Sequence, residues 1–224
     1  MKIDDLLVLM QQRRTIRAYK PDPVPEDHIN KILEAGRWAP SSANSQPWDF
    51  IVVKDATLKQ KIHEVILEVI EKIKTLRDFP FLRSFTAEYV PQAPINIVVC
   101  GDPRFKQVTI MQGVDPQIEE FAFWGSVTLP IQNMLLAAQC LGLGSVVFTD
   151  IFPDKLKKIL NVPDPLKVIC VLPIGYPAEA PELRFRRDLN DFTHQDRFDL
   201  RKMRSDSFVM EARKDPSKFF LKKA

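Results

Sequence analysis

One segment, residues 117–141, limits the possible folds more than any other part of this chain. It reads QIEEFAFWGSVTLPIQNMLLAAQCL and carries no charged side chain after its first few positions. A helix with so little polar surface is stable only when most of that surface is covered. We therefore expect a long helix that is buried on all sides, either inside the domain or in a subunit interface.

The remaining sequence predicts strands and amphipathic helices around this segment. Apolar residues at helical spacing predict a first helix over residues 4–13. A second helix is expected with Pro25 in its first turn, and a third after Asp55, whose carboxylate can cap it. A short helix is expected at PDKLKKIL, and strands at WDFIVV, INIVVC, SVVFTD and KVICVLPIGYP. This order predicts an α+β fold with a central mixed β-sheet flanked by helices.

The composition of the chain argues against nucleic-acid and membrane binding and favours a reducing compartment. The chain has 32 basic and 29 acidic residues, a net charge of +3, which is too small to favour nucleic-acid binding. No apolar run approaches the roughly 20 residues that span a bilayer, and the N-terminal stretch does not resemble a signal peptide. The cysteines Cys100, Cys140 and Cys170 are expected to be buried free thiols. We expect a cytoplasmic protein that does not bind membranes.

The composition changes after Ala178, where the chain becomes highly charged and sparsely apolar. A tail of this kind is either disordered or laid across a partner. We expect a main domain over 1–190 and a C-terminal extension over 191–224, packed on a partner subunit.

Two arginine clusters suggest a phosphate group as ligand. They consist of Arg13, Arg14 and Arg17, and of Arg184, Arg186 and Arg187. The chain has no glycine-rich phosphate loop, since GLGSVV has a valine where a dinucleotide fingerprint needs its third glycine. Guanidinium groups suit a phosphomonoester, so side chains are expected to hold it. The alternative is that these arginines form a solvated surface.

The stretch PSSANSQPW places four hydrogen-bonding side chains between two stiffening prolines. These are Ser41, Ser42, Asn44 and Gln46. Such groups could read the edge of a heteroaromatic ring. Alternatively, the stretch is a turn with a helix cap.

Several blocks together resemble the nitroreductase family of FMN enzymes. RRTIRAY, ILEAGRWAPSSANSQPWDFIVV, IQNMLLAAQCLGLGSVVFTDIF, VLPIGYP and RFRRDL follow the family's order and spacing, over roughly residues 5–190. The resemblance implies an α+β homodimer with two flavin sites, each built from both chains. FMN is then the cofactor, and NAD(P)H is the electron donor.

The resemblance assigns flavin contacts residue by residue. Thr15 stands where a serine is commoner, and Arg17 is our candidate for stabilising the reduced flavin. The partner subunit is expected to supply the stretch from Ser41 to Gln46. The full expected set is Arg13, Arg14, Thr15, Arg17, Ser41, Ser42, Asn44, Gln46, Asn133, Phe148, Thr149, Asp150, Arg186 and Arg187. Which of the last two arginines reaches the phosphate is left open, and for Asn133 the alternative is a buried amide bonded to backbone.

Aromatic residues could stack on flat substrates. The candidates are Phe79, Phe81, Phe85, Tyr89, Phe123 and Trp124, and we assign the substrate contact to the last two. The alternative is that they are ordinary core aromatics.

The family resemblance implies an oxidoreductase that passes electrons from NAD(P)H to nitroaromatic, quinone or similar flat acceptors by a ping-pong mechanism. The flavin carries the chemistry, so we name no catalytic side chain, and no metal site is expected. Two alternatives stay open. One is a flavin-binding protein without turnover, and the other is a specialised member, either a dehalogenase or a flavin-fragmenting enzyme.

Overall fold

The computed structural model describes residues 2–76, 86–108, 113–149 and 151–214. The chain divides into two compact units, Met1–Ala180 and Pro181–Ala224. The expectations for Phe79, Phe81, Phe85 and Asp150 lie outside the described residues.

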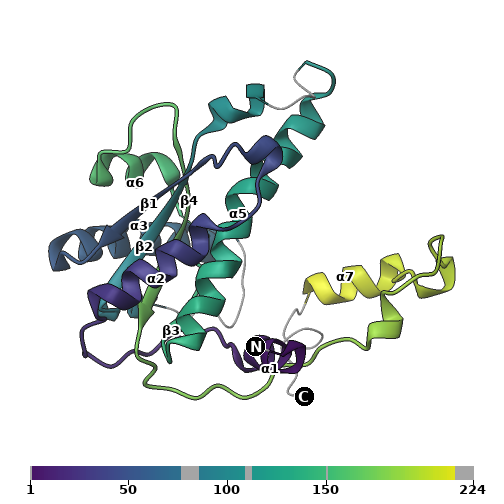
Figure 1. The fold of residues 1–224 in the computed structure, drawn as a ribbon, viewed down its shortest axis with the longest axis horizontal. Helices are drawn as coiled ribbons and strands as arrows, with labels where there is room; N and C mark the ends of the chain where they lie inside the picture. Colours follow the sequence, from purple (N-terminus) through teal and green to yellow (C-terminus); the bar gives the residue numbers. More distant parts are fainter. Residues whose placement is uncertain (1, 77–85, 109–112, 150, 215–224) are drawn as a thin grey trace. The chain divides into compact units, whose positions relative to one another are not determined.

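A four-stranded sheet forms the centre of the first unit (Figure 1). Its strands are β1 (Trp48–Val53), β2 (Ile95–Gly101), β3 (Gly144–Ser145) and β4 (Lys167–Gly175), in the order β1-β2-β4-β3. Every neighbouring pair is antiparallel, and an isolated parallel bridge joins Thr15 to Ser145. The expected α+β class is confirmed, and among the described residues the parallel pairing is limited to this bridge.

The strand expected over SVVFTD is much shorter than predicted. Only Gly144 and Ser145 pair regularly with β4. Phe148 returns to the sheet through an isolated bridge with Val171. The apolar run alone could not show this interruption, because pairing depends on the neighbouring strand.

Helices cover both faces of the sheet. They are α1 (Ile3–Gln12), α2 (Glu26–Arg37), α3 (Ala56–Leu76), the short α4 (Tyr89–Gln92), α5 (Pro116–Cys140) and α6 (Pro153–Leu160). The cap expected at Asp55 is present, since its Oδ1 accepts the Leu58 N–H at 2.8 Å. Short 3-10 turns cover Ser42–Asn44 and Pro103–Val108.

Strand β2 explains the position of the core. Its alternate side chains Ile95, Ile97 and Val99 pack with residues of α2 and α5. The residues between them, including Val98 and Cys100, pack with α3 and α6 on the opposite face. Because successive side chains in a strand point to opposite faces, a continuous apolar run fits a strand covered on both sides.

Within the single chain, helix α5 is buried on one face only, so the expectation of full burial inside the domain is wrong, and burial of the other face in a subunit interface stays a prediction. Val127, Met134 and Ala138 are fully buried, whereas Phe121 is 81% exposed. By length and composition α5 could also cross a membrane. Its buried face packs on α2 and the sheet, as a core helix of a soluble protein does.

The cysteines do not all behave as expected. Cys100 and Cys170 are buried, but Cys140, at the last position of α5, is exposed. Burial raises the pKa of the Cys100 thiol to about 11 and that of Cys170 to about 12. The apolar neighbours of Cys140 in the sequence gave no sign of its exposure, because its side chain lies on the uncovered side of the helix.

The second unit is small, and its described residues, 181–214, contain little regular structure. It has 3-10 turns at Leu189–Asp191 and Leu200–Lys202, followed by helix α7 (Asp206–Lys214).

Candidate functional site

The basic segment 13–17 is attached to the edge of the sheet. It follows α1 directly, and the Ile16 N–H donates to the Ser145 carbonyl at 3.0 Å. The Ile16 side chain is buried against Gly144, where a Cβ atom would lie 2.6 Å from Ile16 Cγ1. Tyr19 also holds the segment, since its buried hydroxyl donates a hydrogen bond to the Ile16 carbonyl at 2.8 Å. The positions of Thr15 and its neighbours are therefore fixed by β3.

The arginines of this segment have different surroundings. The Arg14 guanidinium donates to the Arg13 carbonyl at 2.8 Å and to the Gln11 carbonyl, and so caps the end of α1. Its buried Nε has no hydrogen-bond partner among the described residues. The Arg17 side chain is exposed, while its backbone N–H donates to the Glu179 carboxylate. The segment thus offers guanidinium groups and a hydroxyl within five residues.

The loop formed by residues 41–46 has an unusual backbone. Ala43, Asn44 and Gln46 have φ angles of 52°, 51° and 46°, although none is glycine. The Gln46 N–H donates to Ser41 Oγ at 2.9 Å, and the Gln46 amide donates to the Asn44 carbonyl at 3.2 Å. Asn44 and Gln46 are exposed. The loop therefore presents amide groups at the surface on a backbone that its own hydrogen bonds close.

A serine of helix α5, which the sequence analysis did not single out, is hydrogen-bonded to this loop. The buried Ser126 of α5 accepts the Ser42 N–H at 3.0 Å through its Oγ. Nothing in the sequence around Ser126 distinguishes it from other small helix residues.

The remaining predicted flavin contacts of the first unit lie on α5 and after β3. Asn133 is half-buried, and one of its amide N–H groups donates to the Ala35 carbonyl at 3.0 Å. Phe148 is buried and exchanges backbone hydrogen bonds with Val171 at 2.9 and 3.0 Å. Thr149 is exposed beside it.

The two predicted substrate residues are adjacent but differently placed. Phe123 is 3% exposed and packs against Gly101, whereas Trp124 is 42% exposed. Their rings meet edge to face at 5.3 Å. The Trp124 indole N–H donates to Glu120 Oε2 at 2.9 Å, and a hydrogen bond from Lys106 lowers the pKa of Glu120. Trp124 thus presents a ring whose orientation is held by a carboxylate.

Tyr89, the remaining aromatic candidate among the described residues, belongs to the core. It is 5% exposed, and its ring lies 6.3 Å from that of Phe148.

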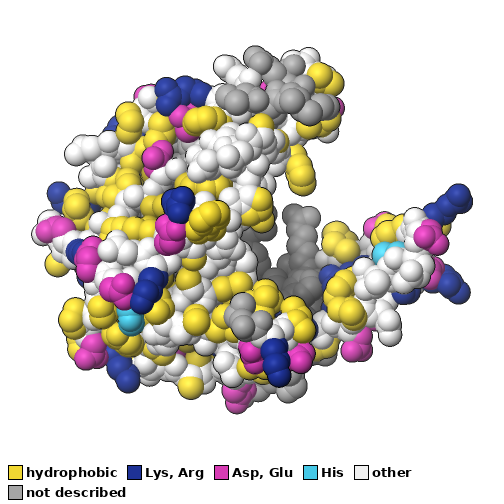
Figure 2. All heavy atoms as spheres, viewed as in Figure 1, with side chains coloured by type: hydrophobic (Ala, Val, Ile, Leu, Met, Phe, Trp, Pro, Cys, Tyr) yellow, Lys and Arg dark blue, Asp and Glu magenta, His cyan; other side chains and the backbone are white. Residues whose placement is uncertain are grey.

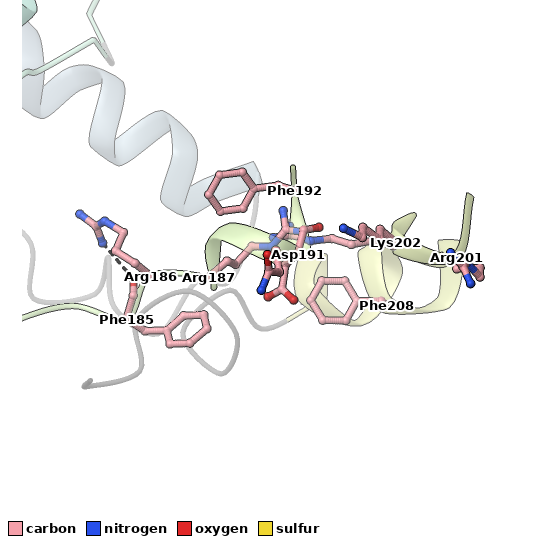
Figure 3. A pocket seen from close by; sticks show the side chains of 10 residues that line it. Phe185, Arg186, Arg187, Asp191, Phe192, Arg201, Lys202 and Phe208 are labelled. Atoms are coloured by element: carbon pink, nitrogen blue, oxygen red, sulfur yellow. Dashed lines mark hydrogen bonds between the residues drawn. The ribbon is translucent and has the colours of Figure 1, made fainter. Parts of the chain in front are cut away.

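The predicted C-terminal basic pair lies in the second unit, beside a hollow (Figure 3). Arg187 extends toward Asp191, whose carbonyl it reaches at 2.6 Å, and its guanidinium lies 5.3 Å from the Phe192 ring. Arg186 instead turns back on the Phe185 carbonyl at 2.9 Å and is exposed. Arg187 therefore holds the turn at Leu189–Asp191, while Arg186 projects into solvent.

The first unit keeps its two groups of predicted flavin residues apart. The loop over 41–46 is attached near the middle of α5, at Ser126, and Thr15 is attached beyond the end of α5, at Ser145 (Figure 1). Cys140, the last residue of α5, lies fourteen positions after Ser126, which corresponds to about 21 Å of helix. One chain thus presents two half-sites that are separated by the C-terminal half of α5.

Within the described part of the chain, no group of three or more His, Cys, Asp or Glu side chains is arranged to hold a metal ion.

Comparison with known proteins identifies the family. Residues 10–176 match the model of the nitroreductase family. The chain belongs to the nitroreductase family. A Methanothermobacter thermautotrophicus protein, provisionally named NADH dehydrogenase/NAD(P)H nitroreductase, is 32% identical over 186 residues, covering 80% of this chain and 81% of that protein. The nitroreductase assignment confirms the expectation of an oxidoreductase enzyme.

Iodotyrosine deiodinases are about as similar to this chain as the relatives named for nitroreductase activity. Iodotyrosine deiodinase of Danio rerio is 34% identical over 199 residues, covering 82% of this chain and 64% of that longer protein. A crystal structure of oxidized iodotyrosine deiodinase bound to FMN and 3-iodo-L-tyrosine superimposes with a TM-score of 0.72 at 25% identity, covering 86% of this chain and 100% of that one. The nitroreductase fold is thus shared with enzymes of more than one activity.

Proposed function

We propose that this nitroreductase-family protein is an FMN-dependent enzyme that passes electrons from NAD(P)H to nitroaromatics, quinones or similar flat acceptors. The observation that carries the proposal is the family match over residues 10–176, which includes both the basic segment at Thr15 and the loop at 41–46. The FMN-bound relative supports the same cofactor.

The residues of the chain fit FMN. The basic segment supplies Arg13, Arg17 and the Thr15 hydroxyl, and the buried, unpartnered Nε of Arg14 leaves one further donor nearby. Such donors match a phosphomonoester and the anionic reduced form of a flavin. From the second unit we assign the phosphate contact to Arg186, since Arg187 is engaged with Asp191 and Phe192.

The remaining flavin contacts are proposed for residues of the first unit. Ser41, Ser42, Asn44 and Gln46 would approach the ring from the partner subunit, because they lie far from Thr15 in their own chain. Asn133 retains a second amide N–H and a carbonyl for the ring. Phe148, Thr149 and Asp150 complete the proposed set.

We propose that the working unit is a homodimer. Exposed apolar side chains gather on α1 and α5, where Figure 2 shows hydrophobic surface; the most exposed are Ile3 and Phe121, at 66% and 81%. No residue of α1 is buried within its own chain. A second copy would cover these faces and bring its own loop to the first chain's Thr15. Within the proposed division, 1–190 is the FMN domain and 191–224 lies on the partner.

When bound, FMN would accept a hydride from NAD(P)H and pass electrons to the acceptor. The chain supplies orientation and charge. Arg17 would stabilise the negative charge of the reduced state, and Trp124 would stack on the acceptor. Because donor and acceptor share one open face, the first must leave before the second enters, which gives ping-pong kinetics.

The test begins with the cofactor. Mass spectrometry of the group released from yellow purified protein should show FMN, and finding FAD would contradict the proposal. Initial rates with NADH or NADPH and a nitroaromatic or quinone should give parallel double-reciprocal lines. Intersecting lines would exclude the ping-pong scheme, and flavin-loaded protein that no nicotinamide reduces would favour a binding protein without turnover.

A second candidate function is reductive dehalogenation. The 34% identity to a deiodinase over most of this chain favours it. Release of iodide from 3-iodo-L-tyrosine by the reduced protein, faster than reduction of nitroaromatics, would replace the first proposal with this one.

We place the enzyme in the cytoplasm, where free thiols such as Cys100 and Cys170 stay reduced.

A further inference from the structure

The loop at 41–46 cannot hold its conformation by local preference. Left-handed backbone is unfavourable for residues other than glycine, and the loop has three such residues, Ala43, Asn44 and Gln46. Conformations of this kind persist only where surrounding contacts impose them. The internal bond from the Gln46 N–H to Ser41 Oγ closes the loop but does not attach it to the rest of the protein.

The attachment is made by Ser126. Its side chain is 3% exposed, and its Oγ accepts the Ser42 N–H at 3.0 Å. The same hydroxyl donates its proton to the Ala122 carbonyl at 2.7 Å, one turn earlier in α5. Since a hydroxyl has one proton, this second bond directs its lone pairs toward Ser42.

The same turn of α5 carries the acceptor-facing aromatic residue. Ala122 directly precedes Phe123 and Trp124. A single buried hydroxyl therefore links the strained loop to the helical turn that presents Trp124. If this hydroxyl is removed, the half-buried Ser42 N–H loses its partner.

We propose that Ser126 is a positioning residue. It holds the loop 41–46 in its flavin-binding conformation and fixes that loop relative to Trp124. The inference rests on the proposed function, because the flavin-binding role of the loop is part of that proposal.

The test compares Ser126→Ala with Thr128→Ala. Alanine is well suited to a helix interior, so both variants should fold. Thr128 is a matched control, because its Oγ1 donates to the Trp124 carbonyl at 2.7 Å in the same way but its side chain is exposed. Two quantities are measured: amide hydrogen exchange of residues 41–46 in the flavin-free protein, and the Kd for FMN.

We expect Ser126→Ala to speed exchange in the loop and to raise the Kd for FMN, each about 5-fold, the ratio corresponding to one ordinary hydrogen bond. Thr128→Ala should change neither by more than about 2-fold, since no bond to the loop is lost. Unchanged loop exchange or FMN affinity in Ser126→Ala would overturn the proposal, as would equal effects in Thr128→Ala. A wild-type protein that binds no FMN would instead refute the proposed function, and exchange in the flavin-free protein would still decide whether Ser126 holds the loop.

Discussion

Thr15 lies opposite Ser145 in a parallel bridge, and the following amide, that of Ile16, donates to the Ser145 carbonyl at 3.0 Å. This pairing attaches a segment near the N-terminus to strand β3, more than a hundred residues later in the chain. The position of the proposed flavin-binding arginines therefore depends on a backbone contact in which none of their side chains takes part.

Gly144→Ala should damage this attachment. The new Cβ atom would lie 2.6–2.8 Å from three side-chain atoms of Ile16, so the basic segment must shift. We expect a loss of stability of roughly 1–3 kcal/mol, as for overpacked cores, together with weaker FMN binding. Urea unfolding and FMN titration measure the two effects.

Gly125→Ala is the matched control for that substitution. A Cβ atom there meets nothing within 4 Å, and the position lies inside helix α5. Replacing glycine in a helix interior should stabilise the protein by about 0.5–1 kcal/mol. A Gly144→Ala variant that matched this gain would show that Ile16 can move without cost.

Arg17→Ala should weaken FMN binding and lower the reduction potential of the bound flavin. Losing a charge-assisted contact costs roughly 1.5–3 kcal/mol, and the cost falls more heavily on the reduced, anionic state. Redox titration against a reference dye measures the potential. An unchanged potential in a variant that still binds FMN would restrict Arg17 to the phosphate or to no role.

Substitution of Arg186 and of Arg187 should have different effects. Arg186→Ala should raise the Kd for FMN about 10-fold or more, as expected for a lost charged hydrogen bond. Arg187→Ala should mainly increase proteolysis of the C-terminal unit, because it removes the bond to the Asp191 carbonyl and the contact with Phe192. The reverse pattern would assign the phosphate to Arg187.

Glu120→Ala should impair binding of the electron-accepting substrate, a nitroaromatic or quinone. The change removes the carboxylate that accepts a hydrogen bond from the Trp124 indole N–H, so the ring loses its fixed orientation. We expect the KM for a nitroaromatic or quinone to rise about 5-fold, equivalent to one hydrogen bond. The rate of reduction by NAD(P)H, followed by stopped-flow absorbance, should be unchanged. Glu64→Ala, at an exposed position on α3, serves as the control.

Stability should fall in alkaline solution because of the buried thiols. Folding raises the pKa of Cys100 from 9.0 to about 11 and that of Cys170 from 9.0 to about 12. Above pH 9 the unfolded chain therefore releases protons that the folded chain retains, and the free energy of unfolding decreases. Each thiol can contribute up to about 1.4 kcal/mol per pH unit.

Urea unfolding from pH 7.5 to 10.5 measures this dependence. Cys140→Ser should keep the wild-type profile, since Cys140 is exposed. A free energy of unfolding that stays constant above pH 9 would contradict the burial of the other two thiols.

The sequence by itself determined helices with apolar residues at regular spacing, such as α3, and strands with a continuous apolar run, such as β2. It also indicated the type of chemistry. The arginine clusters and the stretch from Ser41 to Gln46 were recognisable because residue type and local order carry that information. Apolar periodicity is a local property, so it survives without knowledge of the packing.

Only the tertiary structure decided which surfaces are covered and which distant residues meet. It showed that α5 is uncovered on one face, that Cys140 is exposed, and that the strand after Leu143 contains only two residues. It also showed the contacts of Ser126 with Ser42 and of Gly144 with Ile16. Each of these depends on how segments far apart in the chain pack together, and a small residue such as serine or glycine has the same local pattern whether or not another backbone lies against it.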